Sequence, residues 1–228
     1  MTQVQEQLKT VEDRIRRACD RAGRDRKEVK LIAVSKTKPV EMIEEAYAAG
    51  QRLFGENRPQ ELRDKQPLLP SDIAWHMIGH LQRNKVKYVV GRAALIHSVD
   101  SVRLAEAISE EALSKQIVMP VLVEVNMSME ASKFGLRPED TIEFIEEISR
   151  FQGITVRGLM TIAPYTDDPE TNRPYFRDLR NLSIDITSKN IDNVDICELS
   201  MGMTGDYEVA IEEGATFVRV GTGIFGVR

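Results

Sequence analysis

Short apolar runs alternate with longer amphipathic stretches along most of this chain, and no other feature constrains its fold as strongly. The apolar runs have the length of β-strands and cover residues 30–35, 52–55, 74–78, 95–99, 120–126, 156–160, 196–200 and 217–220. Helical periodicity fills the stretches between them, over residues 40–49, 59–65, 82–90, 101–115, 138–151, 170–189 and 206–213. Because neighbouring parallel strands need a crossover connection, strands that alternate with helices predict a parallel sheet.

The number of strand–helix units favours one closed architecture. About eight such units in a chain of 228 residues predict an α/β protein with a (β/α)8 TIM barrel fold. An open, doubly wound sheet is the competing fold, and the short second strand is the weakest part of the barrel assignment. Apolar residues at three- and four-residue steps predict a further helix at about residues 3–23. No long helix follows the last strand, so we expect this N-terminal helix to take the vacant place in the outer ring.

Charge and composition narrow the class of protein. The formal net charge of −5 gives no basic field that points to nucleic acid or an anionic membrane. No apolar run approaches the roughly 20 residues that a membrane span needs, and the N-terminus lacks a signal-peptide core. Cys19 and Cys197 form no CxxC motif, a pattern typical of a reduced, cytoplasmic protein. We therefore expect a single domain over residues 1–228, with no nucleic-acid or membrane partner.

Polar residues follow several of the predicted strands at the points where a barrel of this type carries its active site. Lys36 directly follows the first strand, Asn57 follows the second, and His76 lies within the third. The last two strands end in residues 200–206 and 219–223, which are rich in glycine and hydroxyl side chains. Either loop alone is a common glycine-rich turn. Together, after strands seven and eight, they favour a phosphate site.

Lys36 is a candidate for covalent binding because of its place in the predicted barrel. A lysine after a strand is usually a solvated charge, and Schiff-base formation requires it to lose a proton against a reference pKa of about 10.4. Burial at the barrel mouth and a nearby cation, such as Lys38 or Arg219, would lower that pKa. Lys38 has an equally simple interpretation as a surface residue.

Longer motifs resemble those of one known family. They are Ser35-Lys36-Thr37-Lys38-Pro39, Phe54-Gly55-Glu56-Asn57, Leu199-Ser200-Met201-Gly202-Met203, the stretch from Trp75 to Lys85 and the stretch from Val218 to Gly226. With shorter matches between them they run from Lys30 to Gly226, and they resemble the pyridoxal 5′-phosphate (PLP) homeostasis protein family. That resemblance implies a fold similar to the barrel domain of alanine racemase and of eukaryotic-type ornithine decarboxylase, which are fold-type-III PLP enzymes.

The resemblance also implies how the ligand is held. Lys36 resembles the lysine that carries PLP as a Schiff base, and Arg219 resembles the arginine that faces its pyridine nitrogen. The implied phosphate binders are Ser200, Gly221 and Thr222, with Met201 and Gly202 in the same loop; Asn57 lines the cofactor, and His76 joins this set with a less specific role. Arg58 stands where the family usually has tyrosine, and Thr204 where serine is common.

The implied activity is binding rather than turnover. An arginine opposite the pyridine nitrogen stays protonated and leaves the nitrogen unprotonated, which weakens the ring as an electron sink. Racemases with this arginine still work, so the residue alone does not exclude catalysis. We also expect the barrel to end at Arg228 without the C-terminal β-domain that completes fold-type-III active sites across a dimer. The resemblance thus implies a monomeric, non-catalytic PLP carrier in vitamin B6 homeostasis, with an indirect effect on amino-acid and keto-acid balance.

Two other functions stay open at this point. One is a low-activity PLP-dependent amino-acid racemase, and the other is a barrel that binds a different phosphorylated metabolite without a covalent link. The expected partners are PLP and apoenzymes that accept it. No metal site is expected, because His76 and His80 fall on a strand end and the following loop rather than on one helix face. His97 is interpreted as a core histidine, and residues 162–169 as a mobile lid over the ligand.

Overall fold

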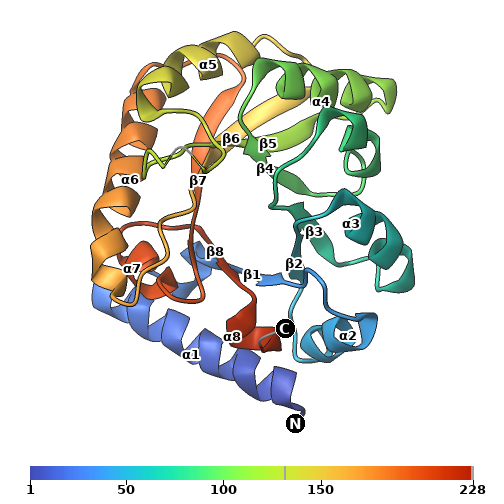
Figure 1. Ribbon diagram of the computed structural model, residues 1–228, viewed down its shortest axis with the longest axis vertical. Coiled ribbons are helices and arrows are strands. Elements are labelled where there is room, and N and C mark those ends of the chain that lie inside the picture. Colours follow the sequence, from blue (N-terminus) through green and yellow to red (C-terminus); the bar gives the residue numbers. More distant parts are fainter. Residues whose placement is uncertain (131, 227–228) are drawn as a thin grey trace.

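Eight parallel strands close into a barrel in the computed structural model, which describes residues 1–130 and 132–226 (Figure 1). Every strand pairs in parallel with the next along the chain, and the first also pairs in parallel with the eighth. The strands are β1 (Lys30–Val34), β2 (Leu53–Glu56), β3 (Ala74–Met77), β4 (Leu95–Val99), β5 (Met119–Glu124), β6 (Ile154–Met160), β7 (Val194–Met203) and β8 (Phe217–Val220). The expected (β/α)8 barrel is confirmed, and closure between β1 and β8 rules out the open sheet.

Helices surround the barrel on its outer face (Figure 1). They are α1 (Gln3–Ala22), α2 (Val40–Ala48), α3 (Pro59–Lys65), α4 (Val102–Ser114), α5 (Thr141–Ile148), α6 (Arg173–Ser188), α7 (Tyr207–Glu212) and α8 (Thr222–Phe225), with short 3₁₀ helices η1 (Arg26–Glu28), η2 (Gln66–Leu68), η3 (Arg83–Tyr88), η4 (Pro138–Asp140) and η5 (Pro169–Asn172). The prediction of an α-helix at residues 82–90 is wrong, because the 3₁₀ helix η3 occupies this segment. Within η3 only Val86 is buried, so this segment has too little apolar surface to support an amphipathic α-helix.

The N-terminal helix α1 lies beside α7 and α8 (Figure 1). A capping box at Thr2 begins it, and Gly23 ends it in the left-handed conformation, with φ of 64°. Its buried stripe is apolar and consists of Val4, Leu8, Val11, Ile15, Ala18 and Cys19. Since α8 has only four residues, α1 covers the part of the barrel that a longer final helix would cover.

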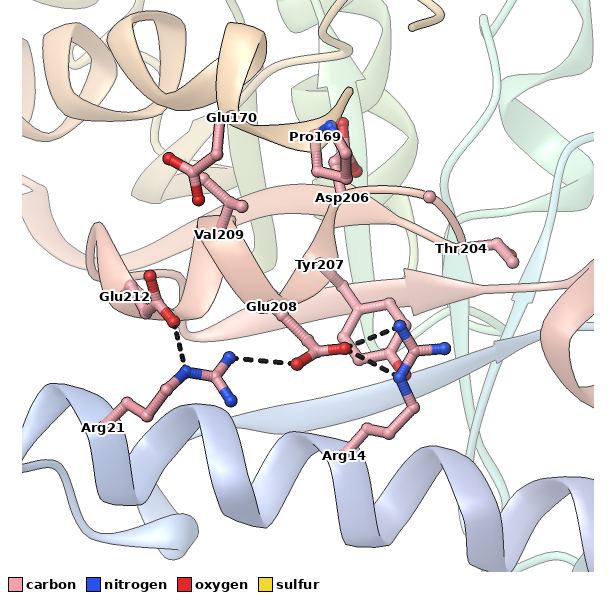
Figure 2. Close-up of a pocket in the computed structure, with 11 residues that line it drawn as sticks. Arg14, Arg21, Pro169, Glu170, Thr204, Asp206, Tyr207, Glu208, Val209 and Glu212 are labelled. Carbon is pink, nitrogen blue, oxygen red and sulfur yellow. Dashed lines mark hydrogen bonds and ion pairs between the residues drawn. The ribbon is translucent and has the colours of Figure 1, made fainter. Parts of the chain in front are cut away.

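Ion pairs between residues that line a pocket tie α1 to α7 (Figure 2). Arg14 Nη2 lies 2.6 Å from Glu208 Oε1, and Arg21 pairs with Glu208 at 2.9 Å and with Glu212 at 2.7 Å. These arginines are half exposed, so each pair adds little stability by itself. Both arginines pair with Glu208, so the ion pairs link two points of α1 to α7, which directly follows the loop after β7.

Polar side chains share the barrel interior with apolar ones. Ile32, Val34, Ile78, Leu95, Leu122, Met160 and Phe217 form the apolar cluster inside the barrel. His97 and Ser200 are fully buried, and His76 and Arg219 are each 4 % exposed. No helix in residues 1–130 and 132–226 has the length and apolar character needed to cross a membrane.

Candidate functional site

A cavity of about 460 Å³ opens at the carboxyl ends of the strands. Its wall contains Val34, Lys36, Asn57, Ile78, Ile162, Pro164, Tyr165, Thr166, Asn172, Met203, Thr204, Gly205, Asp206, Arg219, Gly221 and Thr222. The volume falls within the range of small-molecule sites, about 300–1,000 Å³. Five residues predicted from sequence, namely Lys36, Asn57, Arg219, Gly221 and Thr222, therefore meet in one cavity.

Three side chains, Glu56, Glu61 and Lys65, hold the residues on both sides of Lys36, and we call them the Ser35–Thr37 clamp. Lys65 Nζ donates to the backbone carbonyl of Ser35 at 2.9 Å, and the Ser35 hydroxyl donates to Glu56 at 2.7 Å. On the other side, the Thr37 amide donates to Glu61 at 2.7 Å. Thr37 has φ of 61°, a left-handed conformation that is uncommon for threonine. The clamp thus fixes the turn that carries Lys36.

Charge balance inside the clamp depends on Lys65, whose side chain is only 11 % exposed. Its amine contacts Glu56 at 2.8 Å and Glu61 at 2.9 Å. Burial raises the pKa of Glu56, while the hydrogen bond and charge of Lys65 oppose that rise. The second oxygen of Glu56 is buried without a hydrogen-bond partner among the described residues. The clamp is therefore electrostatically costly without Lys65.

Sequence reasoning missed the clamp. Two sequence features could have pointed to it. Glu56 follows a predicted buried strand, and Glu61 and Lys65 are four residues apart on a predicted helix. Four-residue acid–base pairs are common on exposed helix faces, so that spacing did not indicate burial.

Arg219 presents a buried cation to the cavity. Its Nη1 donates to Ser200 Oγ at 2.6 Å, and its Nη2 donates to the backbone carbonyl of Thr161 at 2.8 Å. Burial lowers the pKa of Arg219 to about 10, so the guanidinium keeps its proton at neutral pH. A guanidinium has five N–H groups; two of them are engaged by these bonds, which leaves others for a ligand acceptor.

The loops after β7 and β8 face each other across the cavity wall. Thr222 Oγ1 lies 3.2 Å from Thr204 Oγ1, and Gly221 adjoins them. Asp206 lines the same wall, with Oδ1 accepting from the Met203 amide at 2.7 Å. Hydroxyl groups and a glycine backbone in such loops are suited to phosphate oxygens.

Ser200, Met201 and Gly202 lie behind the cavity wall rather than on it. Ser200 and Met201 are fully buried within β7, which continues to Met203, past the strand end expected at 200. Gly202 has φ of 88°, and a Cβ there would lie 2.6 Å from that of Ala210. Only glycine therefore allows α7 to pack this closely against the strand.

His76 belongs to the opposite end of the barrel. It lines a separate cavity of about 180 Å³ with Leu95, Arg157, Glu198 and Phe217. Burial lowers the pKa of His76 to about 4, so its imidazole is neutral at physiological pH. Among the described residues no cluster of three or more metal-ligating side chains occurs.

The cavity residues suit PLP as a ligand. An amine, a fixed cation and a hydroxyl-lined loop correspond to the aldehyde, ring nitrogen and phosphate of PLP. The Asn57 carboxamide also has an unsatisfied acceptor: its Oδ1 is buried and has no hydrogen-bond partner among residues 1–130 and 132–226. Buried polar atoms without partners are rare, and a bound group is one explanation for such an atom beside a cavity.

Comparisons with known proteins place the chain in a family. The model for the alanine racemase N-terminal domain matches residues 7–228. The pyridoxal phosphate homeostasis protein of Aquifex aeolicus is 48 % identical to this chain, and the match covers 98 % of this chain and 97 % of the Aquifex protein. The protein of that name from Homo sapiens is 40 % identical, over 97 % of this chain and 85 % of its own.

Solved structures agree with this assignment. PipY of Synechococcus elongatus, solved with PLP bound, has a TM-score of 0.83 and 36 % identity, over 98 % of this chain and 100 % of that one. An alanine racemase of Clostridium difficile shares the fold, with a TM-score of 0.77 and 15 % identity, over 98 % of this chain and 57 % of that one. This chain therefore belongs to the pyridoxal phosphate homeostasis protein family.

Proposed function

We propose that this protein binds PLP through a Schiff base on Lys36 and holds the cofactor without turning over a substrate. One observation carries the proposal: Lys36, Arg219 and the Gly221–Thr222 turn share the wall of a single cavity. On binding, the amine nitrogen forms a C=N bond with the aldehyde carbon, and water leaves. The Ser35–Thr37 clamp fixes the turn from which that amine projects.

The remaining cavity residues contact the phosphate and the pyridine ring of PLP. Thr204, Gly221 and Thr222 bind the phosphate, Arg219 donates to the pyridine nitrogen, and Asn57 contacts the ring. Ser200 supports this site by accepting a hydrogen bond from Arg219, and Gly202 supports it by allowing α7 to pack against β7. Met201 lies between them in the chain and is fully buried. His76 also acts at a distance, through His97.

The cation at the ring nitrogen supports a storage or carrier role. Arg219 donates and cannot accept a hydrogen bond, so it favours an unprotonated pyridine nitrogen and a weak electron sink. All the residues that we assign to PLP lie on one chain, so the proposed binding requires no second copy. Such a protein would contribute to vitamin B6 homeostasis in the cytoplasm and release PLP to apoenzymes.

Borohydride reduction followed by intact-mass measurement tests the covalent link. Reduction fixes a Schiff base as a stable secondary amine, so the wild-type chain gains the mass of reduced PLP and Lys36→Ala does not. Lys133→Ala removes a lysine that lies outside the cavity wall and serves as the matched control. An adduct that survives Lys36→Ala, or a wild-type chain without any adduct, contradicts the proposal.

Isotope exchange separates storage from racemase activity. Incubation with L-alanine in D₂O reports proton removal at Cα by mass spectrometry. A carrier shows no exchange above that of free PLP at equal concentration. Robust exchange that disappears in Lys36→Ala would establish the racemase alternative.

A further inference from the structure

A line of hydrogen bonds runs through the barrel interior from the cavity wall toward the opposite mouth. It begins at Arg219 Nη1, which lies 2.6 Å from Ser200 Oγ, and Ser200 Oγ lies 2.8 Å from His97 Nδ1. His97 Nε2 in turn lies 2.8 Å from His76 Nδ1. None of the four side chains is more than 4 % exposed. The proposed binding of PLP uses Arg219 directly but does not say what His97 does for that residue.

The number of protons that each group can donate fixes the direction of every hydrogen bond in this line. Arginine can only donate, so Ser200 Oγ accepts from Arg219 and its single O–H needs an acceptor elsewhere. The acceptor within reach is His97 Nδ1. The opposite arrangement, with a proton on Nδ1, would leave the Ser200 O–H buried without a partner, which is costly. His97 therefore carries its proton on Nε2 and donates it to His76 Nδ1.

Both imidazoles must be neutral for this arrangement. A protonated His97 would present two donors and would face Ser200 with the wrong group. Burial holds the pKa of His97 well below its ordinary value, and the neighbouring His76 and Arg219 lower it further. The other ring contact of His97 is Phe217, at 5.6 Å between centroids, which carries no charge.

We infer that His97 is a positioning residue for Arg219. By accepting the Ser200 proton, His97 turns the lone pairs of the hydroxyl toward the guanidinium and fixes the direction in which Arg219 presents its free N–H groups to the cavity. The inference rests on the proposed function, since it assumes that Arg219 meets the pyridine nitrogen. His97 itself touches no ligand.

An analogue of PLP tests the orientation of Arg219 separately from overall binding. In this analogue a C–H group replaces the ring nitrogen, so it cannot accept the bond from Arg219. The ratio of its Kd to that of PLP measures that one contact. For wild type we expect PLP to bind at least about tenfold more tightly, the size of one charge-assisted hydrogen bond.

His97→Asn and His97→Leu form a matched pair with nearly the same shape. The asparagine amide reaches the position of the imidazole Nδ1 and can hold the Ser200 hydroxyl, whereas leucine cannot. We expect His97→Asn to keep most of the preference for PLP and His97→Leu to reduce it to about twofold or less. A purely structural defect would weaken both ligands equally in both variants. His80→Phe, a histidine outside the line, should keep the wild-type ratio.

Several outcomes would overturn the inference. They are an unchanged ratio in His97→Leu, an equal loss in both variants, or a wild-type protein that does not distinguish the two ligands. If neither variant folds, ¹⁵N NMR of the wild-type protein without ligand decides, because a proton on His97 Nδ1 contradicts the direction of the line. A missing Lys36 adduct would instead refute the proposed function, and the His97 tautomer remains measurable in that case.

Discussion

The amine of Lys65 donates a 2.9 Å hydrogen bond to the backbone carbonyl of Ser35, the residue directly before Lys36. The same amine contacts Glu56 and Glu61, whose other bonds reach Ser35 and Thr37. One buried cation on α3 thus organises the turn after β1. The turn that carries the proposed Schiff-base lysine is thus held by a second lysine that does not line the cavity.

Replacing this cation should destabilise the protein strongly. In Lys65→Met, Glu56 loses the charge that compensates its burial, and breaking a buried ion pair on one side costs about 3–5 kcal/mol. We expect the free energy of unfolding to fall by about 3 kcal/mol in urea titrations at pH 7. Adding Glu56→Gln to Lys65→Met should restore part of the loss, because the unpaired charge disappears. A single variant as stable as wild type would show that the pair is not buried in solution.

Glu124, at the end of β5, should make stability decrease with rising pH. Burial, with the nearby charge of Asp100, raises its pKa to about 7, and Arg219 only partly opposes this. The folded protein therefore keeps a proton that the unfolded chain releases, so stability falls between pH 4.5 and 7. Glu124→Gln removes this penalty and should be more stable than wild type by about 2–3 kcal/mol at pH 8. The difference should shrink toward zero near pH 4.5 in the same urea titrations.

His76 should produce the opposite dependence on the acid side. Its pKa in the folded protein, about 4, lies below the ordinary value of 6.5. The unfolded chain therefore binds a proton first, and stability falls as the pH drops below 6.5. His76→Gln should lose less stability than wild type between pH 7.5 and 5, by about 2 kcal/mol. Parallel curves for the two proteins would mean that His76 is already solvated in the folded state.

Periodicity was sufficient to predict the barrel, because each strand and helix of this fold carries its own local pattern. The eight strands appear where apolar runs predicted them. Two local failures have physical causes. The segment at η3 forms a 3₁₀ helix because it buries too little apolar surface for an amphipathic α-helix. Strand β7 extends to Met203 because its pairing with β8 continues past the predicted end, with Met203 opposite Arg219.

Side-chain partners across the barrel were harder to predict. Lys36 and Arg219 could be proposed as site residues because the carboxyl ends of the strands meet at one mouth of the barrel. Their individual roles came from the resemblance of their motifs to those of the PLP homeostasis protein family. The contact between Ser200 and His97 joins residues far apart in sequence and depends on which strand faces point inward. His97 was correctly interpreted as buried and satisfied, but nothing in the sequence indicated that its partner also holds Arg219.

The hydroxyl pair in the two last loops should act on the phosphate alone. Thr204 and Thr222 lie 3.2 Å apart on the cavity wall. In Thr222→Val the shape is retained and one donor is lost, so we expect the Kd for PLP to rise about tenfold. The Kd for pyridoxal, which lacks the phosphate, should stay within about twofold. Equal losses for both ligands would place the phosphate elsewhere in the cavity.

The loop between β6 and η5 should become protected when the ligand binds. Ile162, Pro164, Tyr165 and Thr166 line the cavity, yet Tyr165 is 95 % exposed. The loop is tied to the wall through Asn172, which donates to the Pro164 carbonyl at 2.9 Å and to Asp206 at 2.8 Å. A ligand in the cavity would pack against these residues, so local opening becomes less favourable.

Hydrogen exchange measured with and without PLP tests this lid. We expect amides in residues 162–168 to exchange several-fold more slowly in the bound protein, because binding lowers the population of open states. Residues 190–193, in the turn before β7 at the other end of the barrel, are the internal control and should not change. Asn172→Ala should increase exchange of the lid in the free protein, because the loop loses its tie to Asp206. Equal exchange at 162–168 in both states would show that the loop does not close over the ligand.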